Sequence, residues 1–168
     1  MNSSELLEEG AASENRGRIV TLIGVKQARV GYRFIFTNDS SGECNECERR
    51  SVCLGNLEAK RIYEVTKVRE KTFPCKIHAD GVRVVEVVES DIVAAVPKSQ
   101  AFEGAILTFQ SLECEDLDCP MYEVCHPKGV FDGEKCKVLK VDKNFSCPKT
   151  LPLVKALLRR MRVARTTR

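Results

Sequence analysis

The sequence CNECERRSVC, residues 44–53, brings three cysteines into one short loop, and a fourth cysteine follows 22 residues later. A second group of four has a similar layout in the other half of the chain. The last three members of the second group each lie 72 residues after the corresponding members of the first, which predicts an internal duplication. The two groups are Cys44, Cys47, Cys53 and Cys75, and Cys114, Cys119, Cys125 and Cys147.

The repeat extends beyond the cysteines. Val65-Thr66-Lys67-Val68 is echoed by Val138-Leu139-Lys140-Val141, 73 residues further on. A chain of 168 residues therefore divides into two lobes of about 60 to 70 residues. Lobes of that size bury little apolar surface, so we expect each to be held together by its four-cysteine site.

Most of the chain has the pattern of β-strands. Runs rich in β-branched and aromatic residues, several of them alternating with polar ones, are bounded by Gly, Pro and Asn turns. The fold class predicted is mainly β, α+β at most. The expected strands fall within residues 19–25, 31–36, 57–68, 81–89, 91–96, 104–110 and 135–141.

One helix is expected, near the end of the chain. Thr150 is a suitable N-cap, Pro152 suits a first helical turn, and basic residues occupy the face opposite an apolar one. The pattern predicts a basic amphipathic helix over residues 151–163. Its apolar face is Leu151, Val154, Leu157, Leu158 and Met161, and its basic face is Lys155, Arg159 and Arg162.

Charge and composition divide the chain into four parts. Residues 1–17 hold four Glu against one Arg and few large apolar groups, so we expect a disordered acidic leader. Residues 149–168 hold seven Lys or Arg and no acid, which makes them a basic helical tail. Between them we place a first repeat over residues 18–100 and a second over residues 101–148.

The thiols point to metal binding. The sequence has no apolar run long enough for a membrane span and no secretory signal pattern, so we expect a cytoplasmic protein that does not enter the membrane. Structural disulfides are disfavoured in a reducing compartment. Three thiolates from one loop with a fourth from elsewhere are typical of iron–sulfur clusters, with zinc as the alternative. Cys136 is expected to be a buried apolar side chain, and His78 or His126 is a possible substitute ligand.

The sequence resembles a family of archaeal proteins known as uncharacterised protein family 0179. The resemblance covers roughly residues 18–147 and is carried by VTLIGVKQARVGYRFIF, CNECERRSVCLGNLEAKRIYEV, GVRVVEVVES, AFEGAILTF and VCHPKGVFDGEKCKV. It implies no established activity, but it implies two cysteine clusters that have been suggested to be iron–sulfur redox centres. By resemblance, Cys44, Cys47, Cys53 and Cys75 belong to the first and Cys114, Cys119, Cys125 and Cys147 to the second.

These observations favour a small intracellular iron–sulfur protein that transfers electrons to a protein redox partner, with one cluster per repeat. No hydrolase, kinase or dinucleotide-binding motif is present, so an enzyme is not the favoured class. The alternative is a structural zinc protein that contacts RNA or a ribonucleoprotein through residues 151–168. A third possibility is a regulatory or assembly subunit in which cluster occupancy switches binding.

Overall fold

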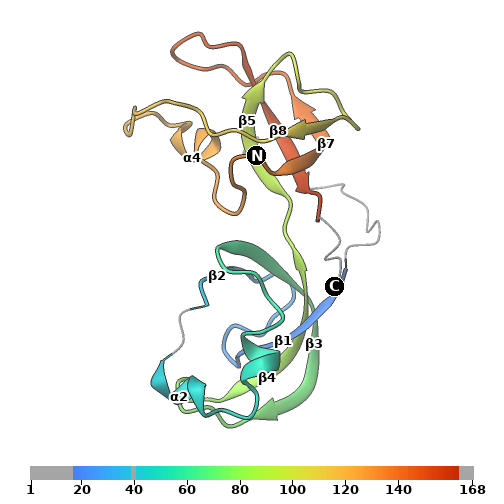
Figure 1. Ribbon diagram of the computed structural model, residues 1–168, viewed down its shortest axis with the longest axis vertical. Helices are drawn as coiled ribbons and strands as arrows, with labels where there is room; N and C mark the ends of the chain where they lie inside the picture. Colours follow the sequence, from blue (N-terminus) through green and yellow to red (C-terminus); the bar gives the residue numbers. More distant parts are fainter. Residues whose placement is uncertain (1–16, 39–40, 163–168) are drawn as a thin grey trace. The chain divides into compact units, whose positions relative to one another are not determined.

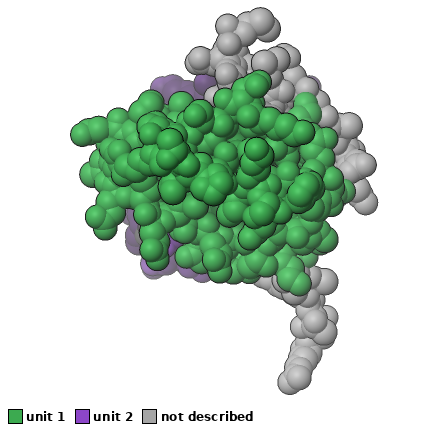
Figure 2. Space-filling view, turned by 90° about the horizontal axis from the view of Figure 1, so that it is seen from above, with its two compact units in different colours: residues 1–12, 91–168 green, residues 13–90 purple. Residues whose placement is uncertain are grey.

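The computed structural model describes residues 17–38 and 41–162, so most of the expected acidic leader lies outside the described residues. The chain forms two compact units that meet in the sequence between Ser90 and Asp91, coloured separately in Figure 2. We call the described residues up to Ser90 the N-terminal unit and those from Asp91 the C-terminal unit. Each unit has one four-stranded sheet, which confirms the mainly β prediction.

The N-terminal sheet is antiparallel, with the strand order β1-β4-β3-β2 (Figure 1). Two short helices, α2 and α3, lie in the connection between β2 and β3. The elements are β1 (Ile19–Gly24), β2 (Arg33–Phe36), α2 (Gly42–Asn45), α3 (Arg50–Cys53), β3 (Arg61–Phe73) and β4 (Val82–Glu89).

The C-terminal sheet repeats this arrangement with the order β5-β8-β7-β6, also antiparallel. One short helix, α4, lies in the connection between β6 and β7, the equivalent place. The elements are β5 (Ile92–Pro97), β6 (Ile106–Thr108), α4 (Tyr122–Cys125), β7 (Lys135–Asp142) and β8 (Leu153–Arg160).

The duplication extends to single hydrogen bonds. A register shift interrupts β3 between Val65 and Lys67, and another interrupts β7 between Val138 and Lys140. Gly31 and Gly104 precede β2 and β6 with φ of 81° and 85°, in the left-handed region that suits glycine. The Gly31 N–H donates to the Val65 carbonyl and the Gly104 N–H to the Val138 carbonyl, both at 2.8 Å. The repeat in the sequence is thus a repeat of one fold.

Each unit has its own apolar core, formed mainly by side chains from the strands of its own sheet. In the N-terminal unit the fully buried members are Tyr63, Val65, Val85 and Val87. In the C-terminal unit they include Ala94, Cys136, Val138, Ala156 and Leu158. Cys136 is therefore a buried core side chain, as predicted.

The predicted C-terminal helix is wrong. Residues Leu153–Arg160 form β8, which pairs with both β5 and β7 in the middle of the sheet. A strand buried on both faces has an almost continuous apolar run, and a short run of this kind also matches the spacing of a helix face. Thr150 is no helix cap and has φ of 58°. Each helix in the described part of the chain has only four residues.

The predicted boundaries also need correction. Residues 91–100 contain β5, which belongs to the C-terminal sheet and not to the first repeat. Residues 153–160 of the predicted basic tail do not form a separate element, because they are β8, a central strand of the sheet. Its cations are engaged within the unit: Lys155 lies 3.3 Å from Asp142, Arg159 donates two hydrogen bonds to Asp91, and Arg160 lies 3.7 Å from Glu134.

Two cysteine sets as candidate metal centres

Each unit presents its four cysteines from the same two connections. Three members of the first set lie between β2 and β3, where Cys44 is in α2 and Cys53 ends α3, and Cys75 lies between β3 and β4. Three members of the second set lie between β6 and β7, where Cys125 ends α4, and Cys147 lies between β7 and β8. All nine cysteines are thiols and not disulfides. The equivalent placement means that one fold delivers the same donor set twice.

A single helical turn shapes the end of each three-cysteine loop. The Arg50 N–H donates to the Cys47 carbonyl at 3.0 Å, and the equivalent Tyr122 N–H donates to the Cys119 carbonyl at 2.9 Å. The N–H groups of Cys53 and Cys125 close the turn on the carbonyls of Arg49 and Met121. Each of these turns lies between the second and the third cysteine of its set.

The third cysteine of each set is anchored on the first strand of its unit. Thr21 of β1 is fully buried, and its hydroxyl lies 3.2 Å from the Val52 carbonyl and 3.3 Å from the Cys53 carbonyl. The Cys53 thiol in turn donates to the Leu22 carbonyl at 3.7 Å. In the C-terminal unit, Cys125 is buried in a cluster with Ala95 of β5 and Leu153 of β8.

The four thiols of each set affect one another electrostatically. The pKa of the Cys53 thiol is raised to about 11, mainly by burial and then by the charges of Cys44, Cys75 and Cys47, in that order of importance. Burial likewise raises the pKa of the Cys125 thiol, followed by the charges of Cys147, Cys114 and Cys119. Each predicted set of four is therefore one electrostatic neighbourhood, in which thiolates repel one another unless a cation balances them.

Cys75 in the first set and Cys114 in the second each have a hydrogen-bond donor at the sulfur. The Ile77 N–H donates to the Cys75 sulfur at 3.4 Å. In the second set, the Lys149 ammonium lies 3.8 Å from the Cys114 sulfur and 3.5 Å from a carboxylate oxygen of Asp116. The charge of Cys114, followed by that of Asp116, raises the pKa of Lys149 above its ordinary value, against the effect of burial. Such donors stabilise thiolates.

In the structure, the sulfurs of neither set are arranged as ligands around one metal position. Within residues 17–38 and 41–162, no three Cys, His, Asp or Glu side chains are arranged to hold a metal ion. Thiols close around a metal as it binds, because metal binding and local ordering are coupled. The two histidines have other contacts: the His126 ring stacks on Tyr122 with centroids 4.2 Å apart, and the His78 ring lies close to Gly24.

Sequence reasoning did not single out Thr21 or Lys149. The signal for Thr21 was its position as a lone hydroxyl inside the apolar run IVTLIG, which becomes strand β1. Lys149 follows Cys147 by two residues, but it contacts Cys114, which belongs to a different connection of the sheet. A contact between residues 35 positions apart is not visible in the local spacing of the sequence. No helix among the described residues is long and apolar enough to cross a membrane.

Comparison with known proteins gives relatives but no solved structure that matches. The family described as "Uncharacterised protein family (UPF0179)" matches residues 19–158. The UPF0179 protein of Methanocaldococcus jannaschii is 38% identical over 130 residues, covering 77% of this chain and 85% of that protein. The UPF0179 protein of Methanothermobacter thermautotrophicus is 34% identical over 144 residues, covering 84% and 97%. The chain belongs to UPF0179, a family with archaeal members.

Proposed function

We propose that the protein binds two iron–sulfur clusters, one in each unit, and transfers electrons to a protein partner. The observation that carries this proposal is the repeated electrostatic neighbourhood of four thiols. Cys53 is coupled to the other three members of the first set, and Cys125 to the other three of the second. The two sets occupy equivalent connections of the duplicated fold.

The donor chemistry fits such a group. Thiolates are soft ligands suited to iron–sulfur clusters, and four are available in each unit. The first cluster would be held by Cys44, Cys47, Cys53 and Cys75, and the second by Cys114, Cys119, Cys125 and Cys147. A bound cluster supplies one-electron chemistry.

The rest of the chain has roles that do not depend on the metal. The sheets carry the two ligand loops, Thr21 and the Ala95 cluster hold the third cysteine of each set, and N–H groups donate to sulfur. Cys47 is exposed and most other members are half-buried, so the sites lie near the surface, where a partner can approach within electron-transfer distance.

Metal analysis of protein purified without oxygen tests this proposal. We expect brown protein with iron and acid-labile sulfide, and a paramagnetic signal after reduction with dithionite. Stoichiometric zinc without iron or sulfide would contradict electron transfer and support the structural zinc alternative. The basic helix through which that alternative was expected to contact RNA does not form, because residues 153–160 are strand β8.

Single substitutions assign the sites. We expect Cys53→Ser and Cys125→Ser each to lose one centre, about half of the bound iron, because each unit has its own ligand set. Cys136→Ala is the matched control, since Cys136 is fully buried in the core and belongs to neither set. Equal metal loss in all three variants would contradict the assignment of ligands.

A further inference from the structure

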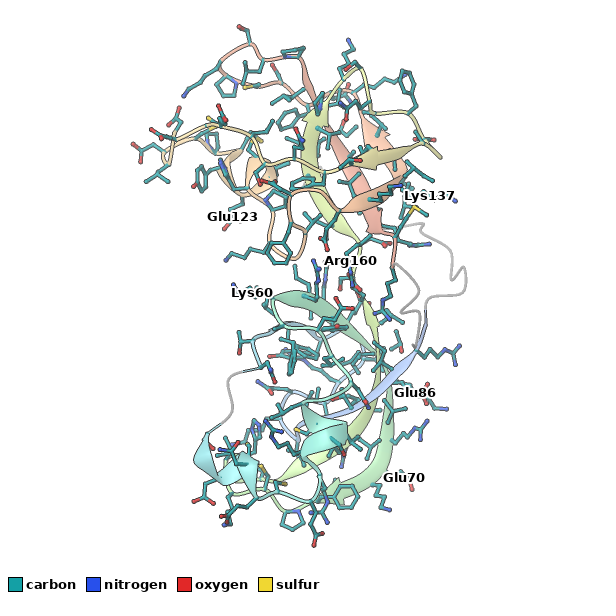
Figure 3. All side chains as sticks on the ribbon, viewed as in Figure 1. Lys60, Glu70, Glu86, Glu123, Lys137 and Arg160 are labelled. Carbon is teal, nitrogen blue, oxygen red and sulfur yellow. The ribbon has the colours of Figure 1, made fainter. Side chains whose placement is uncertain are left out.

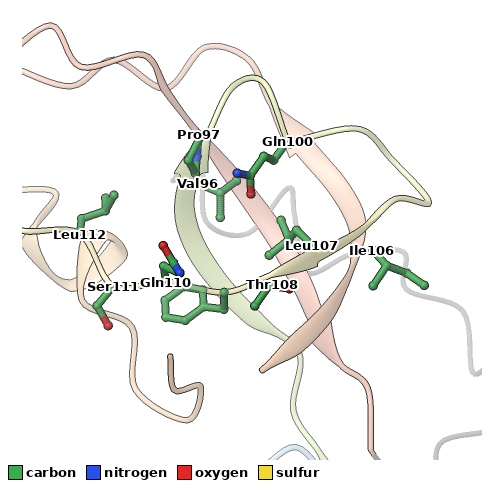
Figure 4. Close-up of a pocket in the computed structure, with 10 residues that line it drawn as sticks. Val96, Pro97, Gln100, Ile106, Leu107, Thr108, Gln110, Ser111 and Leu112 are labelled. Atoms are coloured by element: carbon green, nitrogen blue, oxygen red, sulfur yellow. The ribbon is translucent and has the colours of Figure 1, made fainter. Parts of the chain in front are cut away.

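A cavity of about 530 Å³ opens in the C-terminal unit (Figure 4). It lies between the end of β5 and strand β6, which are the two outer strands of the sheet. Its size is within the range of about 300 to 1,000 Å³ usual for small-molecule sites. Its walls come from Val96, Pro97, Gln100 and the run Ile106–Leu112.

The two units differ in their aromatic side chains at equivalent positions. In the N-terminal unit the rings of Tyr32, Phe34 and Tyr63 pack in sequence, with centroids 6.2 Å and 6.0 Å apart. Phe34 and Tyr63 are cross-strand partners, and their equivalents in the C-terminal unit are Leu107 and Cys136. The equivalent of Tyr32 is Ala105, since both carbonyls accept the N–H of the bulged strand. Three rings are thus replaced by smaller side chains, and Leu107 lines the cavity.

The lining suits an uncharged polar group. None of its ten residues is charged, and the apolar floor includes the buried side chains of Val96, Leu107 and Phe109. Gln100 and Gln110 each offer an amide donor and an amide acceptor, and Thr108 adds a hydroxyl. A flat heterocycle with both donors and acceptors on its edge matches this combination.

Two exposed lysines lie on β7, the strand next to β6. Lys137 is the cross-strand partner of Ile106, and Lys135 is the partner of Thr108. Cross-strand partners lie on the same face of a sheet, so both lysines share the outer face with two lining residues. Figure 3 labels Lys137 on this sheet. Lys98 follows Pro97 at the other wall, and none of these three lysines forms an ion pair with an acid of the described residues.

Exposed aromatic side chains occur in the connections that lead into β6 and β7. Phe102 is 64% exposed, and its N–H donates to the carbonyl of the lining residue Gln100 at 3.2 Å. Phe131 is 42% exposed, and its N–H donates to Glu134. The nearby carboxylates are engaged: Asp132 accepts two hydrogen bonds from Ser111, and Glu134 lies 3.7 Å from Arg160.

We propose that this surface of the C-terminal unit binds single-stranded nucleic acid. A base enters the cavity and bonds to the glutamine amides, Phe102 provides a stacking surface, and Lys135 and Lys137 contact phosphates. Exposed rings beside a row of cations are how single strands are held without sequence preference. The β6 edge has only three residues, which is short for pairing with an added peptide strand. The inference does not depend on the metal centres.

Fluorescence anisotropy with the full-length protein tests the proposal, with labelled single-stranded RNA and DNA of about 16 nucleotides. We expect binding that weakens between about 50 and 200 mM salt. The double variant Lys135→Ala and Lys137→Ala should reduce the salt slope by about 1.4, at roughly 0.7 per phosphate contact with a single strand. Phe102→Ala should weaken binding about 5-fold or more, as loss of one stacked base does.

The matched control is the double variant Lys128→Ala and Lys143→Ala. It makes the same change in net charge with exposed lysines of the same unit that neither line the cavity nor oppose β6. Circular dichroism confirms that each variant is folded. Failure of the wild-type protein to bind either oligonucleotide would overturn the proposal, as would equal effects of the two double variants. Binding of an acidic extended peptide in place of nucleic acid, with the same sensitivity to Lys135 and Lys137, would assign the surface to a protein partner and also overturn it.

Discussion

Thr21 links the first cysteine set to the sheet through one hydroxyl. A threonine buried in an apolar strand requires hydrogen-bond partners, and here they are the carbonyls of Val52 and Cys53 at the end of α3. These hydrogen bonds therefore hold the end of α3, and with it Cys53, against strand β1. The C-terminal unit achieves the same placement with apolar contacts between Cys125 and Ala95.

Thr21→Val should weaken the N-terminal unit. The change keeps the shape of the side chain but removes the donor, so we expect a loss of about 1 to 2 kcal/mol in the free energy of unfolding. Metal content should fall in the first set only. Urea unfolding and metal analysis measure the two effects, and Thr21→Ser, which keeps the hydroxyl, is the control. Unchanged metal content in the valine variant would show that the hydroxyl does not position Cys53.

Glu86 makes the stability of the N-terminal unit depend on pH in the acid range. This carboxylate is buried on β4 and accepts hydrogen bonds from Arg69 at 2.8 Å and 3.1 Å. Those bonds are the main reason that its pKa lies below the ordinary value. A carboxyl with a lowered pKa contributes stability above its unfolded pKa, and the contribution is lost as the pH falls through the folded pKa. The bond is therefore intact at neutral pH and fails in acid.

Glu86→Gln should lower the urea midpoint at pH 7 and flatten its fall between pH 7 and about pH 3. Glu70→Gln is the control, because Glu70 is an exposed carboxylate on the neighbouring strand β3 (Figure 3). We expect the control to retain the wild-type profile. A Glu86→Gln protein with the same acid profile as the wild type would show that another group controls the transition.

At the scale of elements, strands were predictable where one face is buried and the other exposed. Residues 62–65 alternate and become part of β3, and the Gly31 turn marks the entry to β2. Strand β8 was missed because it is buried on both faces, so its sequence LVKALLRR carries no alternation. The internal repeat could have predicted this strand. Strand β4 begins seven residues after Cys75, and β8 begins six residues after the equivalent Cys147.

Leu158→Ala and Met161→Ala distinguish the strand from a surface helix. The side chain of Leu158 is fully buried in the core, with 0% of its surface exposed. Met161 lies just after the end of the strand and is 42% exposed. We expect a loss of about 2 to 5 kcal/mol for Leu158→Ala and little change for Met161→Ala. An amphipathic helix carries both residues on one apolar face, so similar losses for the two variants in urea unfolding would contradict the strand.

At the scale of the whole molecule, the candidate sites differ in how far sequence reveals them. The thiol sets were visible because ligands of one set recur at a fixed offset. The cavity was not, since its lining residue Leu107 stands where Phe34 stands in the other unit, and equivalent positions become clear only from the strand pairing. Likewise, the pairing of Arg159 with Asp91 joins a residue of β8 to one just before β5, 68 positions away in the sequence.

Because each unit has its own core, a core substitution should act on one unit. Val85 of β4 and Val138 of β7 are both fully buried, and each belongs only to the cluster of its own unit. Val85→Ala and Val138→Ala should each cost on the order of 2 kcal/mol. Hydrogen exchange followed by mass spectrometry should then show reduced protection in β1 to β4 for the first variant and in β5 to β8 for the second. Reduced protection throughout the chain in both variants would mean that the two units unfold as one cooperative body.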